Sequence, residues 1–503
     1  MKALCTQLYL RRPPLLVDLL AFVAGAALPL AFAPCNIYII AFISPLVWLI
    51  SLQNISIARA TWRGWLFGFG FFIVGISWIY ISIHVYGGSP LVFAALLTLL
   101  FVAALALVFA FQALCFNYFF NKKHWLTITI GFACIWVLAE ILRSWIFTGL
   151  PWLLLGNSQL STWLRGYAPI VSVYGVSFVV ACSSGLLLNA LRGKKHFLYS
   201  VIAVTILFFV GFVLTQIHWT QPSGKPLKVS LIQGNIPQTI KWDPQFLSLS
   251  LQRYYKLTQK SWDSDVIVFP EGAIPDVFST QKDFLMQLDR QAKQHHSTLI
   301  SGIIMIDRKA FQAYNAITML GNSHGTYLKR HLVPFGEYVP WQNLLGGLIN
   351  FFNLPMASLT SGPSEQPLLQ IGKIPVAAFL CYEIAYLNLI LPSLPQAQLL
   401  ITLSNDSLFG HSWAAAQHLQ IAQMRSLAAG RAQIVVSNSG LTAIINAQGN
   451  IVKQGPRDKI FVLHGSVQPM QGATPLVYFG WLIEFIGLII LTVICWLILQ
   501  QKN

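Results

Sequence analysis

Long apolar runs fill residues 1–219 and return once near the end of the chain. A helix that crosses the ~30 Å hydrocarbon core of a bilayer needs about 20 mostly apolar residues. Eight runs come close to that length: 15–33, 37–53, 64–83, 90–112, 125–142, 167–190, 197–216 and 476–499. The first two are separated by three residues only, so one long segment or a re-entrant hairpin remains an alternative there. The pattern predicts a polytopic α-helical membrane domain with about eight transmembrane helices in all.

Residues 220–472 follow a different pattern, in which short apolar runs alternate with polar turns. Several runs are apolar on both faces, as in buried strands, and longer stretches between them have helical spacing. The predicted strands are 227–233, 266–270, 298–305, 316–320, 374–380, 399–403, 434–437 and 442–445, and the predicted helices are 244–262, 281–295 and 414–429. This alternation is typical of a layered α/β domain. The predicted domains are therefore 1–219 (membrane), 220–472 (extramembrane α/β) and 473–503 (a last helix and short tail).

The distribution of charge supports this division. Only 10% of the residues are charged, against about 25% in soluble proteins. Residues 1–219 hold 12 Lys and Arg and two acids, Asp18 and Glu140, whereas 225–470 hold 19 basic and 13 acidic residues. The net charge of +16 would otherwise favour a polyanion partner, but eleven of the positive charges, Lys502 included, fall on the predicted inner side of the spans, where they fix topology and meet anionic lipid, and residues 225–470 keep only +6. No nucleic-acid partner is expected.

The same charges predict an orientation. If the N-terminus lies inside, eleven Lys and Arg fall on the inner side, and two, Arg143 and Arg165, fall in short outer loops. The inner residues are Lys2, Arg11, Arg12, Arg59, Arg63, Lys122, Lys123, Arg192, Lys194, Lys195 and Lys502. We therefore expect a protein of the bacterial inner membrane with both termini in the cytoplasm and residues 220–472 in the periplasm.

Candidate chemistry is concentrated in the α/β domain. Cys381 is the only one of seven cysteines within it, and it directly follows a predicted strand, where α/β sheets place reactive groups. A lone cysteine is more often a small buried residue, but Glu271 also follows a predicted strand, and Lys329 lies in a segment broken by two prolines and a glycine. A thiol nucleophile needs a base and a positive group. Glu271 and Lys329 could supply them.

Other chemistries have little support in the sequence. No Gly-rich phosphate loop is present, and neither His295-His296 nor His411 with His418 has metal-ligand spacing, so neither a metal nor a cofactor is expected. The acids Asp18 and Glu140 would fit a transport path. Both lie near predicted span ends, however, so snorkelling to the interface or pairing, as of Glu140 with Arg143, explains them better.

Several short motifs resemble those of a known family. The order Phe-Pro-Glu271, Lys329 before HLVPFGEYVP, and Cys381-Tyr-Glu383 resembles the Glu-Lys-Cys triad of the carbon–nitrogen hydrolase, or nitrilase, superfamily. With spans on both sides, the chain resembles the apolipoprotein N-acyltransferase family. Further matching stretches are Phe147–Trp152, Gln233–Gln238 with Lys241-Trp242, Ser404–Asp406 with Phe409-Gly410, and Ser437–Gly440. The sequence departs from the family at Gly272, where another small residue is common.

The resemblance implies an α-β-β-α sandwich for the extramembrane domain and a role for each matching residue. Glu271 would be the general base, Cys381 the nucleophile and Lys329 the cation that stabilises the tetrahedral intermediates. Supporting roles would fall to Glu337, which orients Lys329, and to Tyr382 and Glu383, which shape the turn at the nucleophile. The residues expected to contact substrate are Trp152, Trp242, Trp341, Phe351 and Phe352, the last three in an uncharged stretch, 341–359, that is either a buried helix and loop or a mobile arm on the lipid.

The implied reaction transfers an acyl chain from a phospholipid, through a Cys381 thioester, to the free α-amine of an apolipoprotein's diacylglyceryl-cysteine. It would take place at the membrane, and the enzyme is expected to be a monomer. One alternative is a membrane-anchored nitrilase-type amidase that hydrolyses a small amide. Another is a transporter or scaffold with an inactive hydrolase domain. Seven spans before the domain favour a lipid substrate, because one anchor would suffice for a hydrolase.

Overall fold

The computed structural model describes residues 14–120, 124–340 and 359–480, which form two compact units. One unit, here the membrane unit, contains the described residues of 1–77 and 92–218 together with 478–480. The other, here the α/β unit, contains residues 78–91 and the described residues of 219–477.

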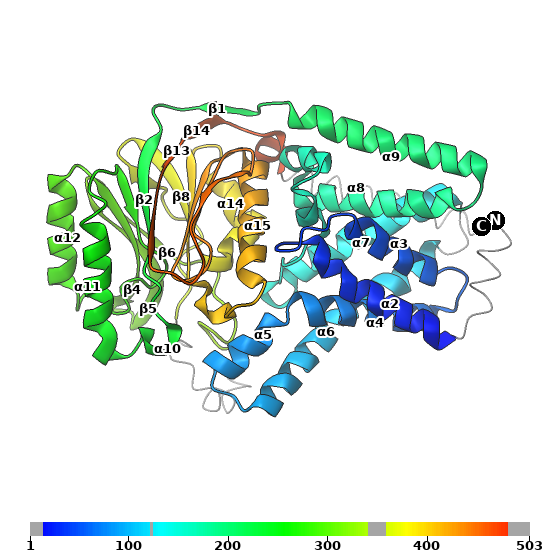
Figure 1. Cartoon of the computed structure of the whole chain (residues 1–503), viewed down its shortest axis with the longest axis horizontal. Helices are drawn as coiled ribbons and strands as arrows, with labels where there is room; N and C mark the ends of the chain where they lie inside the picture. Colours follow the sequence, from blue (N-terminus) through cyan, green and yellow to red (C-terminus); the bar gives the residue numbers. More distant parts are fainter. Residues whose placement is uncertain (1–13, 121–123, 341–358, 481–503) are drawn as a thin grey trace. The chain divides into compact units, whose positions relative to one another are not determined.

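The membrane unit is built from helices. The first helix in the described residues, α2, has Pro14 in its first turn, to which proline is suited because it lacks a backbone N–H. Helix α4 starts after Ser56, whose Oγ accepts the backbone N–H of Arg59 at 3.3 Å. The helices are α2 (Pro14–Ala27), α3 (Ile40–Ser51), α4 (Ile57–Gly75), α6 (Leu91–Phe120), α7 (Trp125–Trp145), α8 (Ala168–Ala190) and α9 (Lys194–Thr215), with short turns η1 (Leu28–Ala31), η3 (Ile146–Thr148), η4 (Leu155–Gln159) and η5 (Trp163–Tyr167) (Figure 1).

The number of spans differs from the prediction. In the described residues, five helical stretches are long and apolar enough to cross a membrane: Pro14–Ala31, Leu91–Phe120, Trp125–Thr148, Trp163–Ala190 and Lys194–Thr215. A sixth is possible if Ile57–Gly75 and Trp78–Tyr86, bent by 54°, form one span. The helix predicted at 37–53 has only 12 residues, about 18 Å at 1.5 Å per residue, and most of the run at 476–499 lies outside the described residues. The expected count of eight is not confirmed.

Buried charges in the membrane unit are held by specific partners. Asp18 accepts hydrogen bonds from Arg59 (2.5 Å) and from the Nε of Arg63 (2.8 Å), so its predicted pairing is confirmed. Glu140 and Arg143 do not form the ion pair we expected. Each instead binds the loop that follows α7, because the backbone groups of that loop are buried and need partners.

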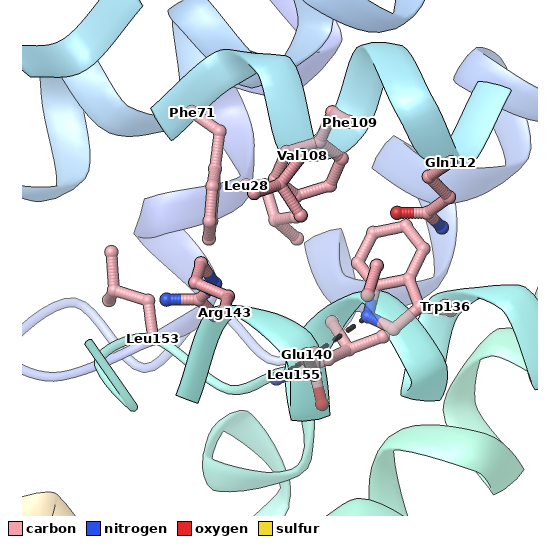
Figure 2. Close-up of a pocket in the computed structure, with 11 residues that line it drawn as sticks. Leu28, Phe71, Val108, Phe109, Gln112, Trp136, Glu140, Arg143, Leu153 and Leu155 are labelled. Atoms are coloured by element: carbon pink, nitrogen blue, oxygen red, sulfur yellow. Dashed lines mark hydrogen bonds between the residues drawn. The ribbon is translucent and has the colours of Figure 1, made fainter. Parts of the chain in front are cut away.

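The two residues hold different points of this loop. The Nη1 of Arg143 donates to the carbonyls of Leu150 (2.8 Å) and Trp152 (2.5 Å). Glu140 Oε1 accepts the backbone N–H of Leu155 at 2.6 Å and the indole N–H of Trp136 at 3.0 Å. Figure 2 shows Glu140, Arg143 and Trp136 on the wall of a small cavity among these helices.

The α/β unit contains two six-stranded sheets (Figure 1). One has the strand order β13-β2-β3-β4-β5-β6, with β2, β3 and β4 parallel. The other has the order β12-β11-β10-β9-β8-β7, with β8, β9 and β10 parallel. The strands are β2 (Leu227–Gln233), β3 (Val266–Val268), β4 (Thr298–Asp307), β5 (Gln312–Gly321), β6 (Gly325–Leu328), β7 (Leu369–Ile371), β8 (Ile374–Leu380), β9 (Leu399–Ser404), β10 (Gln433–Ser437), β11 (Ala443–Ile445), β12 (Ile451–Gln454) and β13 (Phe461–Val467), and a separate pair joins β1 (Thr220–Pro222) to β14 (Met470–Gly472).

The sheets pack face to face and helices cover their outer faces. One buried cluster joins side chains of both sheets, such as Leu231 and Val268 with Leu380 and Leu403. On the outer face of the first sheet, α11 (Leu247–Thr258) and α12 (Lys282–Gln294) bury residues such as Leu288. Helix α15 (Ala414–Ala429) lies on the other sheet, as Figure 1 shows, and is buried along almost its whole length. The predicted α-β-β-α sandwich is therefore confirmed.

Shorter elements complete this unit. They are α5 (Trp78–Ile81), η2 (Ser82–Tyr86), α10 (Gln238–Lys241), η6 (Pro244–Phe246), η7 (Cys381–Ala385), α14 (Leu387–Ile390), η8 (Leu391–Ser393) and η9 (Asp406–Phe409). Two of them come from the N-terminal half of the chain. The ring of Trp78 packs 4.7 Å from that of Phe409, and Ser82 Oγ donates to the carbonyl of Leu408 at 2.8 Å. The run predicted as a span at 64–83 thus ends its helix at Gly75 and continues as part of the α/β unit.

Candidate active site

Glu271 and Lys329 meet at one end of the first sheet. Glu271 comes shortly after β3, and Lys329 directly follows β6. The backbone of Lys329 is fixed on both sides, since its N–H donates to the carbonyl of Asn315 (2.8 Å) and its carbonyl accepts from Gly362 (2.7 Å). The side chain is 1% exposed, and its Nζ lies 3.2 Å from Glu271 Oε1 and 2.9 Å from Glu337 Oε1. The ammonium therefore bridges two buried carboxylates.

Asn315 is a fourth member of this cluster that the sequence analysis missed. It lies on β5, and its Nδ2 donates to Glu271 Oε1 (2.7 Å) and Glu337 Oε1 (2.8 Å). The other oxygen of Glu337 accepts the backbone N–H of Val333 at 2.8 Å. Glu337 thus has donors at both oxygens, and Glu271 is held through its Oε1 by Asn315 and Lys329. Nothing in the short polar stretch before the apolar run at 316–320 distinguished Asn315 from an exposed strand residue.

Cys381 stands where β8 becomes the short helix η7. Its φ of +54° is in the left-handed region, which residues other than glycine rarely adopt. A non-glycine residue in this conformation is held there by its surroundings, and Glu383 supplies part of that support.

Glu383 connects the turn at Cys381 to the Lys329 segment. Its Oε2 accepts the backbone N–H of Leu380 (2.8 Å) and the hydroxyl of Tyr327 (2.9 Å). Its Oε1 accepts the backbone N–H groups of Arg330 (2.8 Å) and His331 (3.0 Å). This fully buried carboxylate thus has four donors and ties the end of β8 to the residues after Lys329. Sequence reasoning placed Glu383 beside the nucleophile but not its partner Tyr327.

Tyr382 is also directed at the Lys329 segment. Its hydroxyl donates to the carbonyl of Leu332 at 2.6 Å, and its ring faces the Nζ of Lys329 at 5.8 Å. The ring therefore fills one side of the space around the ammonium.

Electrostatic interactions link the thiol, the ammonium and the carboxylates. Burial by itself would lower the pKa of Lys329, but Glu271 and Glu337 raise it well above the usual value, so Lys329 is a cation. Burial and then the charge of Glu271 raise the pKa of Cys381 well above that of a free thiol, and Lys329 opposes them. The free site therefore holds a neutral thiol beside a charged lysine. A base must remove the thiol proton as the sulfur attacks, because the thiolate is the nucleophile.

A second buried lysine borders the cluster. Lys241, at the end of α10, donates from its Nζ to the backbone carbonyl of Glu271 at 3.0 Å. Burial lowers its pKa to about 8, although Glu271 opposes that shift. Sequence reasoning singled out its neighbour Trp242 but not Lys241.

The predicted substrate residues fall in three places. The ring of Trp242 lies 3.6 Å from the point where a Cβ on Gly272 would stand, next to Glu271. Trp152 is buried within the membrane unit. Trp341, Phe351 and Phe352 lie outside the described residues.

Two family models match the chain. The model for the apolipoprotein N-acyltransferase N-terminal domain matches residues 24–186, and the carbon–nitrogen hydrolase model matches residues 228–473. The second range includes every residue of the cluster described above.

Full-length relatives agree with both models. The apolipoprotein N-acyltransferase of Coxiella burnetii is 44% identical over 477 residues, which cover 94% of this chain and 98% of the relative. That of Pseudomonas syringae pv. tomato is 41% identical over 501 residues, covering 98% and 99%. Because identity at this level extends over both units, the chain belongs to the apolipoprotein N-acyltransferase family.

Proposed function

We propose that this protein transfers an acyl chain from a phospholipid to the free α-amine of the N-terminal diacylglyceryl-cysteine of apolipoproteins. The observation that carries the proposal is the cluster of a thiol at a strained turn, a buried ammonium and a buried carboxylate, in a chain whose relatives are named for this reaction. The apolar helices of the membrane unit give the enzyme access to lipid.

In the first half-reaction, Glu271 accepts the thiol proton of Cys381 while the sulfur attacks the carbonyl carbon of the phospholipid ester. Negative charge develops on the carbonyl oxygen, and the ammonium of Lys329 stabilises it. Collapse of this intermediate breaks the C–O bond. The leaving alkoxide takes the proton from Glu271 and departs as a lysophospholipid, which leaves a thioester on Cys381.

In the second half-reaction, the amine of the apolipoprotein attacks the thioester carbonyl and gives a proton to Glu271. The C–S bond breaks, and the Cys381 sulfur regains the proton. Asn315 and Glu337 keep Glu271 and Lys329 in place during both steps. The thioester conserves much of the acyl-transfer potential of the ester, so no further energy source is needed. Trp242, beside Gly272, is suited to contact the acyl chain, whereas Trp152 is 2% exposed and is not accessible to lipid in this conformation.

The same proposal includes a location. The protein resides in the bacterial inner membrane as a monomer, with the α/β unit in the periplasm and both termini in the cytoplasm. The excess of Lys and Arg in the predicted inner loops supports this orientation, and a triad drawn from a single chain supports the monomer.

Intact-mass spectrometry tests the acyl-enzyme. Purified protein mixed with micelles of a phospholipid with defined acyl chains should gain the mass of one acyl group, and a diacylated lipopeptide should then remove it and become N-acylated. Cys381→Ala should show no gain. Cys35→Ala, which removes an exposed cysteine of the membrane unit, is the matched control and should behave as the wild type. Ammonia release from small amides without acylation of Cys381 would instead favour the amidase alternative.

A further inference from the structure

A buried histidine lies behind the nucleophile, outside the triad. His418 is on α15 and is 3% exposed. Its Nε2 lies 3.2 Å from the backbone carbonyl oxygen of Cys381, and its Nδ1 lies 3.1 Å from Oδ1 of Asp406. Because β8 and β9 are parallel neighbours, η7 and η9, which follow them, lie at the same edge of the sheet. The imidazole bridges these two turns.

The partners of the ring determine where its protons are. The carbonyl of Cys381 can only accept, so Nε2 must carry a proton. Burial by itself would raise the pKa of Asp406, but hydrogen bonds from His418 and Ser404 lower it below the usual value, and the hydroxyl of Ser404 donates to the same Oδ1 at 2.7 Å. Asp406 is therefore a carboxylate, which also only accepts. Both ring nitrogens therefore face acceptors, and the proton on Nε2 is the one that reaches the carbonyl of Cys381.

We propose that His418 is a positioning residue for the nucleophile: held by Asp406, it donates its Nε2–H to the carbonyl of Cys381 and fixes the left-handed turn that directs the thiol toward Glu271 and Lys329. Glu383 holds the N–H of Leu380 on one side of Cys381, and His418 holds the carbonyl of Cys381 on the other. The turn is thus fixed at two successive backbone positions. The effect on acyl-enzyme formation rests on the proposed function, whereas the hydrogen bond between His418 and the turn at Cys381 does not depend on it.

Two variants separate the two hydrogen bonds. In His418→Gln, the amide nitrogen reaches about as far as Nε2 and can still donate to the carbonyl of Cys381. In His418→Asn, the shorter amide reaches only the position of Nδ1, so it can bind Asp406 but not Cys381. The pair therefore removes one contact at a time from the same buried position.

The experiment uses the full chain in detergent with phosphatidylethanolamine. Acyl-enzyme formation is followed by intact mass, alkylation of Cys381 by iodoacetamide is followed separately, and thermal unfolding is recorded. We expect His418→Gln to acylate within about 3-fold of the wild type and His418→Asn to lose about 10- to 100-fold, the range for leaving one buried acceptor without its donor. Equal rates in the two variants, or a wild-type rate in His418→Asn, would overturn the proposal.

Asp406→Asn keeps the test decisive if a His418 variant does not fold. The introduced amide can donate to Nδ1, so Nε2 keeps its proton and its hydrogen bond to Cys381, and the loss should be smaller than that of His418→Asn. A larger loss at wild-type thermal stability would contradict the proposed role of Nε2–H. Failure of the wild type itself to form an acyl-enzyme would contradict the proposed function, whereas the alkylation rates would still report on the turn.

Discussion

The ionisation of Cys381 depends on two opposing charges, and each can be removed by a substitution of similar size. Burial and Glu271 raise the pKa of the thiol, and Lys329 lowers it. At a fixed pH, Glu271→Gln should therefore increase the thiolate fraction, and Lys329→Met should decrease it. The two substitutions are expected to move the reactivity of one sulfur in opposite directions.

Alkylation by iodoacetamide measures this effect without any lipid. In the wild type, the rate at Cys381 should rise about tenfold per pH unit through neutral pH, because only the thiolate reacts and its pKa lies well above the usual value. Glu271→Gln should react faster than the wild type at each pH, and Lys329→Met more slowly. Cys381→Ala gives the background from the other cysteines. A plateau below pH 8, or a shift of both variants in the same direction, would contradict the electrostatic arrangement.

At this scale, sequence position explains which site residues were predictable. Glu271 and Cys381 each follow a buried apolar run, and Lys329 lies in a segment that cannot form a regular helix. Asn315 and Tyr327 instead occupy strands, where nothing in the alternation of residues marks an inward polar group. His418 was considered only as a metal ligand, because its partners, the carbonyl of Cys381 and the carboxylate of Asp406, are brought to it by the parallel pairing of β8 and β9.

At the scale of elements, the loop after α7 shows how irregular backbone is stabilised inside a membrane unit. The backbone carbonyls of Leu150 and Trp152 accept from Arg143, and the backbone N–H of Leu155, at the start of η4, donates to Glu140. Arg143 was counted among the outer-loop charges in the sequence, yet it is 4% exposed. Its place in the chain, close to the end of the predicted helix at 125–142, was compatible with either role, and only the packing decides between them.

Substitution of Arg143 should therefore destabilise the fold. Arg143→Met removes a charged donor from two carbonyls, and hydrogen bonds to charged groups contribute about 1.5–3 kcal/mol each. We expect a loss of roughly 2–4 kcal/mol and a clearly lower unfolding temperature in detergent. Arg192→Met, in the turn between α8 and α9, is the matched control and should unfold close to the wild type. Equal unfolding temperatures for both variants would show that the loop does not depend on Arg143.

The sequence failed to predict the strands at the edges of both six-stranded sheets, which are β13 and β6 in one sheet and β12 and β7 in the other. β13, residues 461–467, contains His464, Gly465 and Ser466 and forms the exposed edge of its sheet. β6 has only four residues, Gly325–Leu328, which is too short for a periodic pattern. The buried strands β2, β8, β9 and β10 were predicted within a residue of their observed bounds, because burial on both faces requires a continuous apolar run, whereas β5 begins four residues before its predicted start.

At the scale of the whole molecule, the numbers of acidic and basic residues distinguish a membrane part from an extramembrane part. The structure divides the chain into two units at nearly the same residues. Residues 1–219 hold 12 basic and two acidic residues, whereas 225–470 hold 19 and 13. The structure adds residues 78–91 to the α/β unit, which no composition shift announced. Composition indicates whether a part of the chain lies in lipid or in water. It does not detect a short segment such as residues 78–91, which precedes α6 in the sequence but belongs to the α/β unit.

The proposed orientation makes the two parts accessible from opposite sides of the membrane. Lys453, on β12 of the α/β unit, and Lys194, at the start of α9, are both exposed, so a cysteine at either position should react with a maleimide. With a membrane-impermeant maleimide, Lys453→Cys should be labelled in spheroplasts, in which the outer membrane is removed, and Lys194→Cys only after the inner membrane is opened. The unsubstituted chain corrects for its own cysteines. The reverse pattern would place the α/β unit in the cytoplasm and Lys194 and Lys195 on the periplasmic side, which short loops rich in Lys and Arg avoid. The periplasmic assignment would then have to be abandoned, even if the acyl-enzyme forms.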